Sequence, residues 1–290
     1  MNKIIAIIGP TGVGKTKLSI ELAKKFNGEI INVDAMQVYR GLDIGTAKIT
    51  EQEKEGIIHH LFDIKEVTEN YTVFDYQKDA RNVIEEIKAK GKTPIFVGGT
   101  GLYLKAALFN YEFKEEKDNP EINLSNQELV EKIIKIEGKC DIHLNNTKRL
   151  KRHYIKLLTD SKNTNKGNEL LYDVIFVGLT TERDVLYDKI NKRVDKMMEN
   201  GLLEEVKSFY DKSIFSKALT SGIGYKELYS YLKGEITLEN AIDKIKQNSR
   251  HYAKRQYTFF NNQLKVNWFN TNYEDFSKTT EEIVNYINEQ

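Results

Sequence analysis

The amino-acid sequence predicts an α/β fold in which a parallel β-sheet is flanked by helices. Short apolar runs alternate with helical patterns in the first third of the chain, and a glycine-rich segment separates the first run from the first helix. Nearly the whole chain after Thr181 has helical periodicity. Because alternating strands and helices build a parallel sheet with helices on both faces, we expect that sheet together with a helical C-terminal region.

The first expected strand covers residues 4–8, an isoleucine-rich run without polar residues, which is typical of a strand buried on both faces. Apolar residues then recur at helical spacing from Leu18 to Phe26, which predicts a helix. The same reasoning predicts, in order, a strand at 29–34, a helix at 74–90, a strand at 94–97 and a helix at 102–108.

The pattern changes after about Glu112, where a charged stretch at 115–120 ends in a proline. Helical patterns follow at 127–137 and 147–158, then a polar linker at 161–168, and an apolar strand returns at 172–179. We therefore predict two domains: a discontinuous core formed by residues 1–113 and 168–290, and a small all-helical insertion domain at residues 114–167.

The composition limits the classes of protein to consider. The 290 residues carry a formal net charge of +1, so any nucleic-acid site must be a local basic surface. The single cysteine, Cys140, excludes an intramolecular disulfide and suits a reducing compartment. No apolar stretch approaches the roughly 20 residues of a membrane helix, and the N-terminal apolar run is too short for a signal peptide. We expect a cytoplasmic monomer without a membrane partner.

The glycine-rich segment GPTGVGKT fits the G-x-x-x-x-G-K-[ST] phosphate-binding pattern. It lies between a predicted strand and a helix N-terminus, which is the context that the pattern requires. Its backbone N–H groups can surround a polyphosphate, Lys15 adds a positive charge, and the Thr16 hydroxyl can ligate Mg²⁺. This predicts a P-loop NTPase-like sheet whose phosphate-binding residues are Gly9, Pro10, Thr11, Gly12, Val13, Gly14, Lys15 and Thr16.

Asp34 ends one predicted strand and Thr100 follows another, so both belong to the edge of the sheet that carries the phosphate loop. A carboxylate beside bound phosphates can ligate Mg²⁺ or accept a proton from a nucleophile. On position alone, Asp34 can also be a helix-capping or turn aspartate. Thr100 lies in the turn Gly98–Gly101, whose glycines allow a ligand to approach closely.

Two helical segments are rich in basic residues. In the first, Leu150, Leu157 and Leu158 occupy one half of the helix, and the other half carries Lys148, Arg149, Lys151, Arg152 and Lys156. In Arg250–Arg255 the cations are expected on one side, with Tyr252, Phe259 and Phe260 on the other. Each basic face is either a solvated surface or a contact for a polyanion larger than a mononucleotide.

The pair His59-His60 is expected to be structural. Neighbouring side chains diverge in regular structure, and no Cys, Asp or Glu at a suitable spacing completes a zinc site.

The segment DAMQVYRGLDIGTAK, at Asp34–Lys48, resembles the signature that follows the second strand in bacterial tRNA dimethylallyltransferases, also called tRNA isopentenyltransferases. GPTGVGKT also resembles this family, and so do four further blocks in family order at 97–103, 190–197, 222–228 and 252–256. The middle differs, because KRLKRHYI stands where the family tends to have Gln-Arg-Leu-x-Arg-Ala-Leu-Glu, and the insertion is short.

The resemblance implies transfer of a dimethylallyl group from dimethylallyl diphosphate to N6 of the adenine 3′ to the anticodon of tRNA. The phosphates are then those of the prenyl donor, and the loop, Mg²⁺ on Thr16 and Arg193 stabilise the leaving diphosphate. Asp34 would accept the N6 proton and Thr100 would contact the reacting groups. The implied tRNA-binding residues are Asp34, Ala35, Met36, Gln37, Tyr39 and Thr100, with Lys148, Arg149, Lys151 and Arg152 for the anticodon stem-loop backbone.

Two alternatives share the phosphate loop. A small-molecule or nucleoside kinase would bind ATP there and could use Arg149 and Arg152 as lid arginines over the γ-phosphate. An RNA-binding protein could use the loop only to sense a nucleotide.

Overall fold

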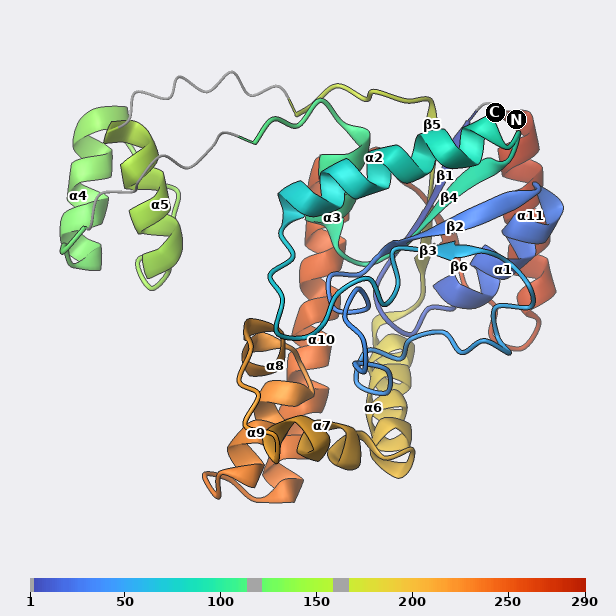
Figure 1. The fold of residues 1–290 in the computed structure, drawn as a ribbon. Coiled ribbons are helices and arrows are strands. Elements are labelled where there is room, and N and C mark those ends of the chain that lie inside the picture. Colours follow the sequence, from blue (N-terminus) through green and yellow to red (C-terminus); the bar gives the residue numbers. More distant parts are fainter. Residues whose placement is uncertain (1–2, 114–121, 159–166) are drawn as a thin grey trace. The chain divides into compact units, whose positions relative to one another are not determined.

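The computed structural model describes residues 3–113, 122–158 and 167–290 (Figure 1). The chain divides into two compact units, one formed by Met1–Asn110 with Glu169–Gln290 and the other by Tyr111–Asn168. The charged break expected at 115–120 lies outside the described residues, as does most of the linker expected at 161–168.

The larger unit contains a six-stranded parallel sheet with the strand order β3-β2-β4-β1-β5-β6. This confirms the predicted α/β class. The strands are β1 (Ile4–Ile8), β2 (Gly28–Val33), β3 (His59–His60), β4 (Thr93–Gly98), β5 (Val174–Thr180) and β6 (Asn267–Asn270). The two edge strands, β3 and β6, were not expected from the sequence, because neither is an apolar run.

Helices cover both faces of the sheet. Ile5 and Ile7 of β1 belong to the core beneath α1 (Lys15–Lys25) and α11 (Phe276–Glu289). The alternate residues Ile4, Ala6 and Ile8 belong to the core that includes α2 (Val73–Ala89) and α3 (Gly101–Leu108). Since successive strand residues point to opposite faces, every position of β1 is buried, which explains its uninterrupted isoleucine-rich sequence.

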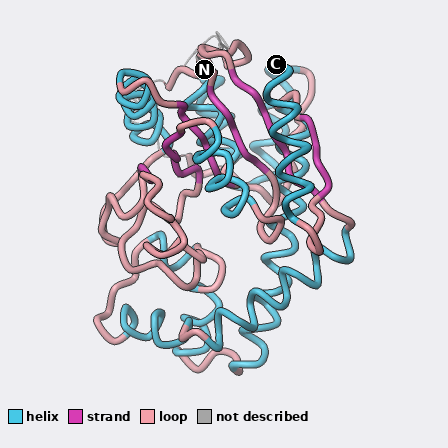
Figure 2. Tube along the Cα trace, turned by 90° about the vertical axis from the view of Figure 1, so that its right-hand side faces the viewer, coloured by secondary structure: helices cyan, strands magenta, loops and turns pink. Residues whose placement is uncertain are grey.

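The helical C-terminal region extends from the carboxyl edge of the sheet (Figures 1 and 2). It comprises α6 (Arg183–Glu199), α7 (Leu202–Tyr210), α8 (Lys217–Ser221), α9 (Tyr225–Leu232) and α10 (Leu238–Gln263). The 26-residue α10 packs against α9, α6 and α3, so it connects this region to the sheet. The two termini lie close together at the opposite edge, where Lys3 Nζ donates a hydrogen bond to the Gln290 carbonyl.

The smaller unit contains α4 (Asn126–Glu137) and α5 (Thr147–Leu158), the two helices predicted for the insertion. Ser125 and Glu128 form a capping box at the start of α4, and Leu129, Ile133 and Leu150 are fully buried between the helices. Leu158 departs from the expected pattern, because it is 52% exposed at the end of α5.

His59 and His60 both contact other groups of the protein, and His59 also lines the cavity of the larger unit described below. His60 Nε2 lies 2.7 Å from a carboxylate oxygen of Glu29, and His59 Nδ1 lies 2.8 Å from the Ile57 carbonyl oxygen. No cluster of three or more metal-ligating His, Cys, Asp or Glu side chains occurs among the described residues.

Within residues 3–113, 122–158 and 167–290, none of the helices combines the length and the apolar character that crossing a bilayer requires.

Candidate active site

The phosphate loop connects β1 to the N-terminus of α1, as the sequence predicted. Gly12 and Gly14 have φ angles of 89° and 90°, a conformation that side chains with a Cβ rarely adopt. A Cβ at Gly9 would lie 2.5 Å from the Leu179 carbonyl oxygen. The glycines are therefore needed for the path of the loop, which brings backbone N–H groups to a helix N-terminus.

Lys15 is the first residue of α1 and folds back over the loop, where its ammonium group donates hydrogen bonds to the carbonyls of Gly9 (2.9 Å) and Pro10 (2.6 Å). Burial, and to a smaller extent the positive charge of Arg193, lower the pKa of Lys15 to about 7, although the negative charge of Asp34 opposes this shift. An anionic ligand beside this side chain would therefore stabilise its charged ammonium form.

Binding of a diphosphate should therefore be coupled to protonation of Lys15. The pKa of about 7 means that the free side chain is mostly neutral above that pH, and an adjacent anion raises the pKa. We expect pyrophosphate to bind with uptake of up to about one proton near pH 8 and with little uptake near pH 6. Calorimetry in buffers of different ionisation enthalpy measures this uptake.

Lys15→Arg is the matched control, because a guanidinium stays protonated over this whole pH range. It should show only the proton exchange of pyrophosphate itself. Equal proton uptake by the wild type and Lys15→Arg would contradict the coupling.

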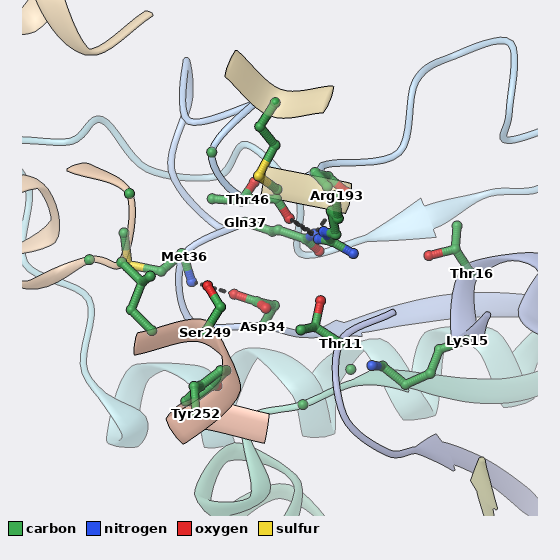
Figure 3. A pocket seen from close by; sticks show the side chains of 18 of the residues that line it. Thr11, Lys15, Thr16, Asp34, Met36, Gln37, Thr46, Arg193, Ser249 and Tyr252 are labelled. Atoms are coloured by element: carbon green, nitrogen blue, oxygen red, sulfur yellow. Dashed lines mark hydrogen bonds between the residues drawn. The ribbon is translucent and has the colours of Figure 1, made fainter. Parts of the chain in front are cut away.

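Asp34 follows β2 directly and lies in the cavity beside the phosphate loop (Figure 3). Its Oδ1 accepts a hydrogen bond of 2.8 Å from the Met36 N–H, and its own N–H donates to Asn32 Oδ1 at 2.9 Å. Asp34 is thus a turn aspartate, one of the two roles considered from the sequence. Because this turn bond involves only Oδ1, Oδ2 remains able to accept a proton or ligate a cation.

Thr100 lies beside Asp34, where it links the turn after β4 to the turn after β2. Its Oγ1 accepts a hydrogen bond of 3.2 Å from the Ala35 N–H, and its N–H donates to the Val33 carbonyl at 2.9 Å. Thr100 also hydrogen-bonds Tyr252 of α10. The expected convergence of Asp34 and Thr100 at one edge of the sheet is therefore present.

Tyr252 and Arg255 correct the expectation for the second basic segment. The sequence placed Tyr252 opposite the cations, but both side chains line the cavity, and the Arg255 guanidinium lies 5.6 Å from the centre of the Tyr252 ring. Burial and then the charge of Asp34 raise the pKa of Tyr252 to about 12, so its hydroxyl stays protonated. Their i,i+3 spacing was the signal that one helix face carries both.

Arg193 of α6 and Gln37 share one acceptor. Arg193 Nη2 donates to the Thr46 carbonyl at 3.3 Å, and Gln37 Nε2 donates to the same oxygen at 3.1 Å. Burial lowers the pKa of Arg193 and Asp34 opposes that shift. Figure 3 shows Arg193, Gln37 and Thr46 together on one side of the cavity, with Asp34, Thr11 and Lys15 nearby.

These side chains surround a cavity of about 410 Å³ in the larger unit. Of the residues proposed from the sequence, it brings together Thr11, Lys15, Thr16, Asp34, Met36, Gln37 and Arg193. Residues that sequence reasoning did not select also line it, among them Met197, Tyr225, Ser249 and Gln256.

Tyr39 is not among the residues that line this cavity. Its side chain is only 9% exposed and packs in the hydrophobic core, and its backbone forms an isolated bridge with Lys65. Ala35 contributes its backbone N–H to Thr100 but does not line the cavity.

The four proposed basic residues of α5 belong to the smaller unit. Lys148, Arg149 and Arg152 are exposed there, and Lys151 is half-buried.

The cavity can hold a hard divalent cation. The Thr16 side chain is exposed at the N-terminus of α1, and the Asp34 carboxylate lines the same cavity. Mg²⁺ is usually held by one or two protein oxygens together with waters and substrate phosphates, so these two oxygen donors fit it.

Comparisons with known proteins show which family of proteins the chain is similar to. A family model described as IPP transferase matches residues 37–263. The chain is 47% identical to a tRNA dimethylallyltransferase of Anoxybacillus flavithermus, over 98% of this chain and 96% of that protein. It is similar to the crystal structure of a full-length tRNA isopentenylpyrophosphate transferase from Bacillus halodurans, with 46% identity, coverage of 99% and 96% of the two chains, and a TM-score of 0.78. A eukaryotic dimethylallyltransferase acting on tRNA is 31% identical over 98% of this chain and 78% of its own, with a TM-score of 0.79.

Proposed function

Because the chain belongs to the IPP transferase family, we propose that it transfers a dimethylallyl group from dimethylallyl diphosphate to N6 of the adenine 3′ to the anticodon of tRNA. It is an enzyme of tRNA modification, as its relatives named tRNA dimethylallyltransferase are, and the kinase alternative has no support among them. The observation that carries the site assignment is that a phosphate loop and Asp34 share one cavity of about 410 Å³.

The phosphate loop would bind the diphosphate of the donor and stabilise it as the leaving group. The allylic C–O bond breaks as negative charge builds up on the departing oxygen, and the loop N–H groups, Lys15 and Arg193 oppose that charge. Mg²⁺ held by the Thr16 hydroxyl would supply further neutralisation of the diphosphate, which leaves Oδ2 of Asp34 free to accept a proton.

Asp34 would act as the general base. The adenine N6 is a weak nucleophile because its lone pair is delocalised into the ring, and it must lose a proton as the C–N bond forms. Thr100 and Tyr252 connect the turn of Asp34 to α10 and so hold the carboxylate in position. Gln37 and Met36, which line the same cavity, would contact the base.

The acceptor adenine must leave the stack of the anticodon loop to enter this cavity. We propose that the RNA lies against the larger unit at the cavity and against the basic face of α5 in the smaller one. The enzyme would work as a monomer in the cytoplasm, where its tRNA substrate is found.

The basic face of α5 provides a prediction. Replacing Lys148 and Arg149, both exposed, with Gln should weaken tRNA binding and lower the slope of log affinity against log salt by about 0.9 per lost phosphate contact. Filter binding across a salt series measures both, and donor affinity should not change.

The matched control is Lys132→Gln with Lys135→Gln, which removes the same charge from the exposed surface of α4 in the same unit. An equal loss of affinity in both double variants would mean that only net charge matters. Unchanged affinity at low salt in the α5 variant would show that its basic face is merely solvated.

Donor choice tests the proposed function. Nothing in the phosphate loop reads adenine or ribose, so the space beyond the phosphates must select the ligand. Calorimetry with Mg²⁺, in the presence and absence of tRNA, should show that dimethylallyl diphosphate binds in preference to ATP and that pyrophosphate competes with it. Tight ATP binding without donor binding in either condition would assign the site to a kinase.

A further inference from the structure

The loop at residues 41–46 provides the carbonyl on which two site residues depend. Thr46 O accepts the hydrogen bonds of both Arg193 and Gln37. We propose that Glu205, in the first turn of α7, is a positioning residue that holds this loop and thereby aims Arg193 and Gln37 into the cavity. The inference rests on the proposed function, in which Arg193 faces the diphosphate and Gln37 the adenine.

The Glu205 carboxylate accepts hydrogen bonds from three consecutive backbone N–H groups of the loop. Oε2 accepts from Asp43 at 3.0 Å and from Ile44 at 2.7 Å, and Oε1 accepts from Gly45 at 3.1 Å. Hydrogen bonds to a charged acceptor are roughly twice as strong as neutral ones. One side chain therefore determines the position of three loop residues that lie about 160 positions away in the sequence.

Tyr225 of α9 also holds the Glu205 carboxylate and the loop in place. Its hydroxyl donates to Glu205 Oε1 at 2.6 Å, and burial together with the Glu205 charge raises its pKa, so the hydroxyl remains a donor. A Cβ at Gly45 would lie 2.6 Å from the Tyr225 ring, which means that the loop backbone packs directly on that ring. The loop is thus held by both α7 and α9.

The hydrogen bonds of Glu205 influence the cavity through Thr46, the residue after Gly45. The Thr46 hydroxyl donates a hydrogen bond to the Leu42 carbonyl at 2.6 Å, which ties the two ends of the loop together. The Thr46 carbonyl therefore moves whenever the loop moves. If the loop shifts, the shared acceptor of Arg193 and Gln37 shifts as well. Misplacing a positioning contact by about 1 Å can cost around 10²-fold in rate.

Glu205→Gln tests the proposal, with Glu204→Gln as its matched control. Gln keeps the size of the side chain but replaces one acceptor oxygen with a donor that faces the loop N–H groups. Glu204 also lies in the first turn of α7 and is exposed, so its variant reproduces any effect on the helix dipole. Single-turnover prenylation and pyrophosphate affinity are measured for both variants, and thermal unfolding shows whether each is folded.

We expect Glu205→Gln to lower the single-turnover rate by about tenfold or more and to weaken pyrophosphate binding, whereas Glu204→Gln stays within about twofold of the wild type. In an Arg193→Gln background, Glu205→Gln should cause little further loss of pyrophosphate affinity, since it acts through Arg193. If Glu205→Gln does not fold, Glu205→Asp keeps the charge but shortens the reach, and the same losses are expected.

Equal behaviour of the Glu205 and Glu204 variants, or losses of affinity that simply multiply in the double variant, would overturn the proposal. If the wild type makes no prenylated tRNA, the proposed function fails, and the pyrophosphate measurements still decide the role of Glu205.

Discussion

Asp34→Asn is expected to lower turnover by about 10²–10⁴-fold while tRNA binding stays nearly unchanged. The amide keeps the shape of the side chain, and its oxygen can still accept the hydrogen bond from the Met36 N–H. It cannot accept the proton that N6 must lose as the C–N bond forms. Single-turnover rates at saturating donor and tRNA measure the loss directly.

The matched control is Asp188→Asn, the same chemical change on the exposed surface of α6, where Asp188 pairs only with Lys192 in the described structure. It should leave the rate unchanged. A loss below about tenfold for Asp34→Asn would mean that Asp34 serves only its turn and that another group accepts the proton.

Lys15→Ala is expected to lower the rate by about 10²-fold, on the order of 3 kcal/mol of lost leaving-group stabilisation. The variant removes a half-buried ammonium group that donates to two loop carbonyls and has no carboxylate partner in the described structure. The effect should appear in kcat as well as in donor affinity, because charge on the diphosphate is greatest when the C–O bond breaks.

Lys17→Ala is the control for Lys15→Ala. Lys17 lies in the same first turn, is exposed, and has its ammonium group 4.9 Å from the centre of the Phe276 ring. Its loss should change the rate by less than about threefold, since exposed charges contribute little. Equal losses in the two variants would show that the loop needs only positive charge near the helix N-terminus.

The strand, phosphate loop and first helix were predictable because their signals are local. An apolar run, the phosphate-loop pattern and a helical period all occur within Ile4–Lys25, and the loop glycines take the positive φ angles that the pattern requires. Asp34 and Thr100 were predictable for a related reason, because the carboxyl ends of parallel strands share one edge of the sheet.

Other features depend on which face of an element meets the cavity, and the sequence does not contain that information locally. Tyr39 packs in the core although the adjacent Arg40 is exposed, and Tyr252 shares the cavity face with Arg255. The edge strand β3 consists of two histidines, so it has no apolar signal. Nothing local in the sequence marks Glu205, and only the fold brings it from the first turn of α7 to Gly45.

The most direct measurement is to incubate the purified protein with tRNA, dimethylallyl diphosphate and Mg²⁺, digest the RNA to nucleosides, and identify the modified base by mass spectrometry. We expect N6-dimethylallyl adenosine from the position 3′ to the anticodon, with one diphosphate released per group transferred, and a rate of formation about 10²–10⁴-fold lower when Asp34→Asn replaces the wild type. An unmodified tRNA, together with transfer of phosphate from ATP to a small molecule, would contradict the account.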